Sequence, residues 1–274
     1  MAEGAPASTV MGYSLEGSVE IERLEIHTRV WEPETESMLA QIDLPRAPSC
    51  IDLGCGPIGV LGPLSRKAGV EGRVVGLDMD RRFLELAATR VKSECEANVE
   101  LLQGDAYATG LPSASFDFVH ERGLIGPLGH ADDVLAEMLR LVKPGGVIAM
   151  QEPDHHTLRL FPRCVAYEAL VEILGTYFVS VGGDPASGHK IFQLLHRGRL
   201  RDIQLRGSMK VLKDGHPYMR MMLLALRSAR AGIVDAMLAT DRELDRIAEA
   251  VEERLREPGT YHTTITLVQS WGTR

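Results

Sequence analysis

The stretch IDLGCGPIG, residues 51–59, decides the fold. It joins an apolar run that ends at Asp52 to a tight turn containing Gly54 and Gly56, and a helical pattern follows. Glycine lets a backbone turn sharply and approach a ligand with no side chain in between. Free amides at the start of a helix favour a carboxylate, and open α/β sheets bind ligands at the carboxyl ends of their strands. The turn is therefore predicted to bind a ligand.

Short apolar runs alternate with helical patterns around this turn. Strands are expected at residues 50–53, 74–78, 99–103, 116–120 and 147–151. Helices are expected at residues 60–68, 81–94 and 132–141. Strands interleaved with helices predict a parallel sheet covered on both faces. Two later alternating runs, residues 201–212 and 263–271, would complete the sheet as an antiparallel pair. The predicted fold class is α/β, with a doubly wound, mostly parallel seven-stranded sheet of the Rossmann-like kind.

Helical patterns outside the alternating region would cover a ligand site. One helix is expected at residues 19–31 and a second at 34–42, with Pro33 near its start. The stretch PRAP, residues 45–48, then marks a boundary. Later helices are expected at residues 161–181, 190–196, 217–231 and 241–257, the last as a solvated outer helix. The expected parts are an N-terminal helical lid segment (1–48), a cofactor-binding core (49–152) and a region of substrate lid helices that also completes the sheet (153–274).

Composition argues against several classes of protein. The net charge of −8 argues against a nucleic-acid binder, which needs clustered positive charge. No stretch approaches the length of apolar residues that a membrane span needs, so no membrane partner is expected. The first residues lack a signal-peptide pattern, which predicts a cytoplasmic protein. The 4 cysteines include no CxxC pair, which indicates reduced thiols rather than a disulfide framework or a zinc site.

Three aspartates follow the first three predicted strands. Asp52 precedes the glycine turn, where a carboxylate would repel a pyrophosphate but suits the positive amino group of an amino-acid-like cofactor. Asp78, in VVGLDMD, lies at a strand end, where an acid accepts hydrogen bonds from both ribose hydroxyls. Asp105, in GDA, could accept from an adenine amine while the Ala106 amide donates to a ring nitrogen. The pattern predicts a nucleoside that carries an amino-acid-like group.

Together with ASFDFV (114–119) and LRLVKPGGVIAM (139–150), these motifs resemble those of class I S-adenosylmethionine-dependent methyltransferases over residues 49–152. The resemblance implies S-adenosylmethionine as cofactor, with its methionine moiety at the turn, its ribose at Asp78 and its adenine against Met79. The N-terminal segment resembles a natural-product subgroup in which a leading tyrosine and helix close over the cofactor. The cofactor-binding residues so implied are Tyr13, Arg23, Asp52, Gly54, Cys55, Gly56, Asp78, Met79, Gly104, Asp105, Ala106, Glu121 and Arg122.

Candidate catalytic residues follow the fourth and fifth strands. A hydroxyl nucleophile gains from a general base, commonly histidine, and the candidates are His120, Glu121 and His155. Asp154, His155 and His156 also contain the residue types of a two-histidine, one-carboxylate metal site. Adjacent histidines on one chain rarely both point at one ion, so no metal is predicted.

The predicted function is methyl transfer from S-adenosylmethionine to an O, N or C nucleophile of a small hydrophobic secondary metabolite. One alternative is a protein of the same fold that binds this cofactor without methylating, as a cyclisation catalyst or regulator. Another is an NAD(P)-dependent oxidoreductase, because Gly54, Gly56 and Gly59 also fit GxGxxG. No Tyr-x-x-x-Lys pair occurs, which argues against its short-chain form. A homo-oligomer is compatible with the sequence.

Overall fold

A seven-stranded sheet forms the centre of the computed structural model, which describes residues 18–93 and 98–274. The strand order is β3-β2-β1-β4-β5-β10-β7, and β10 runs antiparallel to both of its neighbours while the other pairs are parallel. The strands are β1 (Ser49–Leu53), β2 (Arg73–Asp78), β3 (Val99–Gln103), β4 (Phe116–Arg122), β5 (Val142–Asp154), β7 (Arg201–Ser208) and β10 (Thr266–Thr273). The predicted α/β class and the antiparallel completion of the sheet are confirmed.

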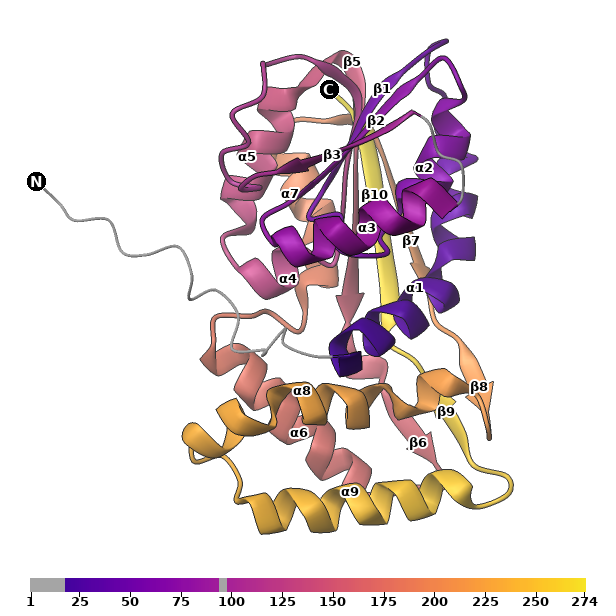
Figure 1. Ribbon diagram of the computed structural model, residues 1–274, viewed down its shortest axis with the longest axis vertical. Coiled ribbons are helices and arrows are strands. Elements are labelled where there is room, and N and C mark those ends of the chain that lie inside the picture. Colours follow the sequence, from indigo (N-terminus) through magenta and orange to yellow (C-terminus); the bar gives the residue numbers. More distant parts are fainter. Residues whose placement is uncertain (1–17, 94–97) are drawn as a thin grey trace, which may run out of the picture.

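Helices cover both faces of this sheet, as Figure 1 shows. Alternate residues of a strand point to opposite faces, so Cys50 packs with one core cluster and Ile51 with another. The first cluster includes residues of α1 (Ser18–Leu39), α2 (Leu61–Ala68) and α3 (Arg81–Ser93). The second includes residues of α4 (Ile125–Leu128), α5 (Ala131–Leu141) and α7 (Ile191–Arg197). The inner strands β1 and β2 are buried on both faces, which explains their mostly apolar sequences, whereas the edge strands β3 and β7 are more exposed.

The N-terminal region departs from the prediction in one respect. The two helices expected at residues 19–31 and 34–42 form a single helix, α1, with Pro33 inside it. Proline in a helix interior removes one backbone hydrogen bond. Tertiary packing offsets that loss, because Trp31 and Met38, on either side of the proline, are fully buried in two different core clusters.

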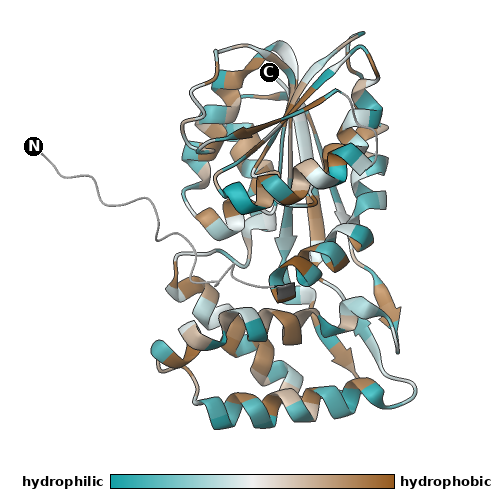
Figure 2. Ribbon diagram, in the orientation of Figure 1, coloured by the Kyte–Doolittle hydropathy of each residue, from teal (hydrophilic) through white to brown (hydrophobic). Residues whose placement is uncertain are grey.

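A second layer lies beyond the carboxyl end of β5 (Figure 1). Its helices are α6 (Val165–Ser180), α8 (Met221–Asp235) and α9 (Asp241–Arg256). A small sheet beside them has the order β6 (Arg159–Phe161), β9 (Tyr261–Thr263) and β8 (Val211–Lys213). Three short helical turns lie in the connecting segments, namely η1 (His155–Thr157), η2 (Ser187–His189) and η3 (Pro217–Arg220). Figure 2 shows α9 as mostly hydrophilic, and its buried residues are Leu244 and Val251, so the predicted outer helix is confirmed.

The small sheet corrects two predicted strands. The runs expected at residues 201–212 and 263–271 each divide between the two sheets, because β7 ends at Ser208 and β10 begins at Thr266. At the crossing, the Lys210 amide donates to the Thr264 hydroxyl and the Thr264 amide donates back to the Lys210 carbonyl, both at 3.0 Å. Simple alternation could not reveal this change of partner.

No helix within residues 18–93 and 98–274 is long and apolar enough to cross a membrane.

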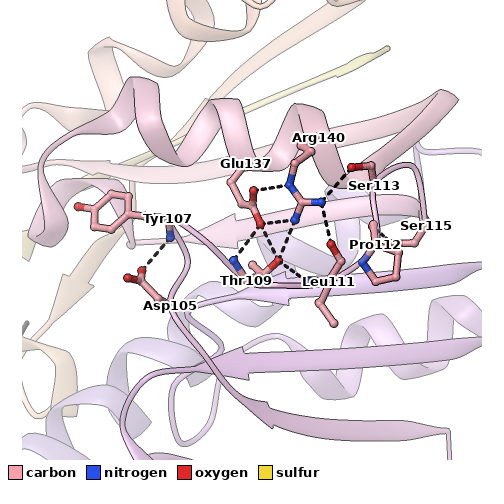
Figure 3. Close-up of polar contacts among 9 residues, drawn as sticks. All are labelled: Asp105, Tyr107, Thr109, Leu111, Pro112, Ser113, Ser115, Glu137 and Arg140. Atoms are coloured by element: carbon pink, nitrogen blue, oxygen red, sulfur yellow. Dashed lines mark hydrogen bonds and ion pairs between the residues drawn. The ribbon is translucent and has the colours of Figure 1, made fainter.

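The connection between β3 and β4 contains no helix and is held by side chains (Figure 3). Glu137 on α5 accepts from the Thr109 amide at 2.9 Å and from the Thr109 hydroxyl at 2.5 Å. Arg140 donates to the same carboxylate and to the Leu111 carbonyl. The Arg140 hydrogen bond outweighs the effect of burial and, with the Thr109 donors, lowers the pKa of Glu137 to about 2. This network fixes the segment that follows Asp105.

Replacing Glu137 with Gln is expected to lower the free energy of unfolding at pH 7 by about 1–3 kcal/mol, because a charged acceptor of buried hydrogen bonds is lost. The depressed pKa of Glu137 means that its stabilisation is complete above the ordinary carboxyl pKa and is lost as the pH falls toward about 2. Urea unfolding at several pH values should therefore show the difference between wild type and variant shrinking between pH ~5 and ~2. Glu249→Gln, an exposed position, is the matched control and should change little.

Candidate active site

The glycine turn and the three predicted aspartates lie at the carboxyl ends of adjacent strands. Asp52 is on β1 and Asp78 ends β2, while Asp105 follows β3, and these three strands are neighbours in the sheet. The Gly104 amide donates to the Asp78 carbonyl at 3.0 Å, which places the GDA motif beside the end of β2. Asp52 and Asp78 are buried and Asp105 is exposed. The sheet therefore brings together the carboxylates that the sequence analysis singled out.

The turn needs glycine at two positions. Gly54 has φ 66° and Gly56 has φ 61°, in the left-handed region that other residues rarely adopt. A Cβ at Gly54 would lie 2.4 Å from Leu124 Cδ1. The Gly56 amide donates to Asp78 Oδ2 at 2.8 Å, and the Cys55 amide donates to the Leu77 carbonyl. The turn is thus attached to the end of β2.

Other predicted cofactor residues surround this turn. Burial raises the pKa of Asp78, although hydrogen bonds from the Asp80 and Gly56 amides oppose the rise. Met79 exposes 49% of its surface beside Asp78, which gives a ring an apolar face to pack on. Ala106 is buried, and the Asp105 carboxylate accepts from the Tyr107 amide at 2.9 Å. Burial raises the pKa of the Cys55 thiol well above its usual value, so this thiol stays neutral.

His120 lies in a buried hydrogen-bonded chain. Its Nδ1 is 2.7 Å from Asp52 Oδ1 and its Nε2 is 2.7 Å from Gln151 Nε2. Gln151 Oε1 accepts from Thr35 and Gln269, so the Gln151 amide nitrogen donates to His120 Nε2. His120 must then donate its Nδ1 proton to Asp52. Both ring nitrogens are engaged, an arrangement that orients Asp52 and leaves no lone pair to accept a substrate proton.

Glu121 and Glu152 form a buried pair of carboxyl groups. Glu152 accepts from the Ile125 and Gly126 amides at 3.0 and 3.2 Å and from the Ser187 hydroxyl at 2.6 Å. Burial and the neighbouring Glu152 charge raise the pKa of Glu121 well above its usual value. A hydrogen bond between the two carboxyl groups raises the pKa of Glu121 further and opposes the rise that burial gives the pKa of Glu152. Glu152 is the hydrogen-bond acceptor of the pair and Glu121 is its neutral partner.

The predicted arginines occupy different environments. Arg122 donates to the Thr35 and Thr28 hydroxyls on α1 at 3.3 and 3.2 Å, and burial lowers its pKa. Arg23, also on α1, forms an ion pair with the buried Glu20 at 2.6 Å. Tyr13 lies outside the described residues.

A histidine that the sequence analysis missed joins this group. Burial lowers the pKa of His27 well below its usual value, and the charges of Arg122, Arg23 and His155 lower it further, which places all four groups near one another. The His27 ring stacks on Tyr218 with centroids 6.3 Å apart. The signal for this face was present in the sequence, because residues 23, 27, 31 and 35 recur at intervals of four, which places them on one side of a helix.

His155 lies beyond the end of β5 with one ring nitrogen engaged. Its Nδ1 donates to the Pro185 carbonyl at 3.0 Å, and no contact of its Nε2 is found within the described part of the chain. Burial lowers the pKa of His155, which keeps the ring neutral at pH 7. Its backbone and side chain both contact Pro185. His155 thus points away from Asp154 and His156, and His189 lies beside those two residues instead.

Residues 50–146 match the family model described as a methyltransferase domain. This part of the chain is thus similar to methyltransferase domains. Demethylmenaquinone methyltransferase of Lactococcus lactis is 35% identical over 136 residues, which are 47% of this chain and 52% of that protein. The chain thus spans about half the length of this relative, and the matched part agrees with the resemblance expected over residues 49–152.

Solved structures share the fold of this methyltransferase domain and its surroundings. The YcgJ protein from Bacillus subtilis superposes with a TM-score of 0.59 at 15% identity, covering 88% of this chain and 99% of that one. Phosphoethanolamine N-methyltransferase 2 of Haemonchus contortus, solved with S-adenosyl-L-methionine, superposes with a TM-score of 0.55 at 16% identity, covering 98% and 61%. At these identities the likeness establishes the architecture of the domain and the layer beside it.

Substitution by glutamine should affect stability differently at Glu121 and at Glu152. Glu121→Gln should leave the free energy of unfolding at pH 7 unchanged or raise it, because an amide resembles a protonated carboxyl in shape, can donate in its place and needs no proton taken up on folding. Glu152→Gln should cost about 1–3 kcal/mol, because it places an NH2 group among hydrogen-bond donors. Chemical denaturation of both variants measures the difference, and an equal loss in both would contradict the assignment of the neutral partner.

The raised pKa of Glu121 also sets a pH dependence. A raised carboxyl pKa in the folded state favours folding at low pH, and that contribution is lost as the pH rises through the folded-state pKa. As the pH rises above the ordinary carboxyl pKa, wild type should therefore lose stability by a component that Glu121→Gln lacks. Parallel unfolding curves of the two proteins at every pH would show that this carboxyl does not titrate as assigned.

Proposed function

We propose that this chain binds S-adenosylmethionine at the glycine turn and transfers the methyl group to a nucleophile of a small hydrophobic molecule. One observation carries the proposal, namely the placement of Asp52, Asp78 and Asp105 at the tips of three adjacent strands around Gly54 and Gly56. A pyrophosphate at the turn would meet the negative charge of Asp52, whereas the ammonium group of a sulfonium nucleoside would meet complementary charge there.

The residues present fit this cofactor in each of its parts. The Asp78 carboxylate keeps lone pairs for two ribose hydroxyls, and exposed Met79 offers a surface to the adenine. Asp105 and the Ala106 amide would contact the adenine edge. Partly buried Arg122, whose described hydrogen bonds go to neutral threonine hydroxyls, suits the carboxylate of the methionine moiety. Asp52, held by His120, suits the ammonium group.

The bound cofactor would supply an electrophilic methyl group on a positively charged sulfur. The chain's own contribution is then to align the acceptor and exclude water. Residues of α1 and the second layer supply the apolar side of this space, because Trp31, Tyr218 and Met221 share one buried cluster beside His27. The name of the Lactococcus lactis relative, a demethylmenaquinone methyltransferase, supports a hydrophobic small-molecule substrate. A secondary metabolite remains the proposed kind of substrate.

Among the three predicted catalytic residues, the contacts favour His155 as a general base. Both nitrogens of His120 are engaged, and Glu121 is held neutral in its buried pair. His155 donates from Nδ1 to Pro185, which leaves the Nε2 lone pair to accept a proton from a hydroxyl nucleophile.

Isothermal titration calorimetry with S-adenosylhomocysteine tests the cofactor assignment. We expect one site per chain, and we expect Asp78→Asn to weaken binding on the order of 10- to 100-fold, because a charged acceptor of hydrogen bonds is lost. The matched control is Glu100→Gln, at an exposed position of β3. Thermal stabilisation by NAD(P) and none by S-adenosylhomocysteine would reverse the choice of cofactor.

His155→Gln tests the base in a methyl-transfer assay with a hydroxyl acceptor. We expect kcat to fall on the order of 100-fold while the affinity for S-adenosylhomocysteine stays the same. The wild-type rate should fall as the pH drops through the His155 pKa, which burial places below 6.5. The rate of the variant should not show this fall at acidic pH. His196→Gln, an exposed change, is the control. An unchanged pH profile in His155→Gln would show that this ring is not the base.

A further inference from the structure

Three potential metal ligands meet beyond the carboxyl end of β5. Asp154 Oδ1 is 2.6 Å from His156 Nδ1, and Asp154 Oδ2 is 3.0 Å from His189 Nε2. One ligand atom from each residue lies within 4.8 Å of the other two. The two imidazole rings stack with centroids 5.8 Å apart and an interplanar angle of 16°. One ion could contact all three side chains after small rotations.

The chemistry of this set selects a class of ion. Two imidazole nitrogens and one carboxylate oxygen suit zinc and the neighbouring divalent transition metals, whereas magnesium and calcium prefer oxygen ligands alone. The side chains of His156 and His189 are 66% and 59% exposed, so an ion can enter from solvent and retain water ligands. Asp154 is 9% exposed by the same measure and forms the inner wall of the site.

The backbone that carries these ligands is fixed by contacts within the protein. The segment that ends at His189 is tied to β5, because the Ser187 hydroxyl donates to Glu152 and the His155 amide donates to the Pro185 carbonyl. A Cβ at Gly188 would lie 2.9 Å from the Glu152 carbonyl, so this segment packs directly on the strand. The Asp154 carboxylate is oriented by the His156 amide at 3.0 Å. Ligands held in place lose little conformational freedom when an ion binds.

We propose that Asp154, His156 and His189 form a binding site for a divalent transition metal of the zinc class, with water in the remaining positions. The site is separate from the proposed cofactor residues and does not depend on methyl transfer. A bound ion would link the end of β5 to η2, whose flanking segment carries the Pro185 carbonyl that orients His155. Its effect would therefore be to stabilise that connection.

Direct metal binding tests the proposal. Protein without a polyhistidine tag is stripped with a chelator and titrated with Zn²⁺ by calorimetry, and with Co²⁺ by visible absorption, which reports nitrogen and oxygen ligands. We expect one ion per chain for each metal and no saturable binding of Mg²⁺. His156→Gln, His189→Gln and Asp154→Asn should each weaken Zn²⁺ binding at least about tenfold, on the scale of a lost ligand or its partner. The double histidine variant should lose the stoichiometric site.

Two control variants distinguish this site from chance binding to surface histidines. His196→Gln changes an exposed histidine on α7, and His155→Gln changes the neighbour in sequence that points to Pro185. Both should retain the wild-type affinity for Zn²⁺. Circular dichroism and melting curves verify that each variant is folded. Absence of stoichiometric Zn²⁺ binding by the wild type, or equal loss in the control variants, would overturn the proposal.

Discussion

The buried carboxylate of Asp52 is the constraint on which the arrangement of the site depends. A buried charge is costly unless it is hydrogen-bonded, and His120 supplies that bond from the adjacent strand β4. His120 is in turn held by Gln151 on β5, which accepts from Gln269 on β10 and from Thr35 on α1. One hydrogen-bonded chain thus crosses four strands and reaches the helix above them. The position of the glycine turn and the position of α1 are consequently linked.

The second layer is attached to the central sheet through shared core clusters. Helix α1 joins the two parts, because Met38 packs with β1 and α2 whereas Trp31 packs with Tyr218 and Met221. The Glu121–Glu152 pair and Ser187 fix the loops between them.

The sequence predicted the parts of the fold that depend on local pattern. The glycine turn, Asp78 at the end of β2 and Asp105 after β3 are each signalled by residues close in the chain, and strand adjacency then brings them together. His189 lies 35 residues from Asp154 and joins it only because the intervening chain forms α6 and returns. The continuity of α1 through Pro33 likewise depends on the burial of Trp31 and Met38 against other elements. Such contacts are set by tertiary packing, which local periodicity does not encode.

The backbone amides of Gly56 and Asp80 donate to the two oxygens of Asp78, one to each. The rotamer of this side chain is therefore selected when the protein folds. A nucleoside that approaches it meets a carboxylate whose torsions are already restricted, so association entails little further loss of side-chain entropy. If Asp78 binds the ribose as proposed, selectivity for a vicinal diol would come from the fixed direction of the remaining lone pairs as well as from charge.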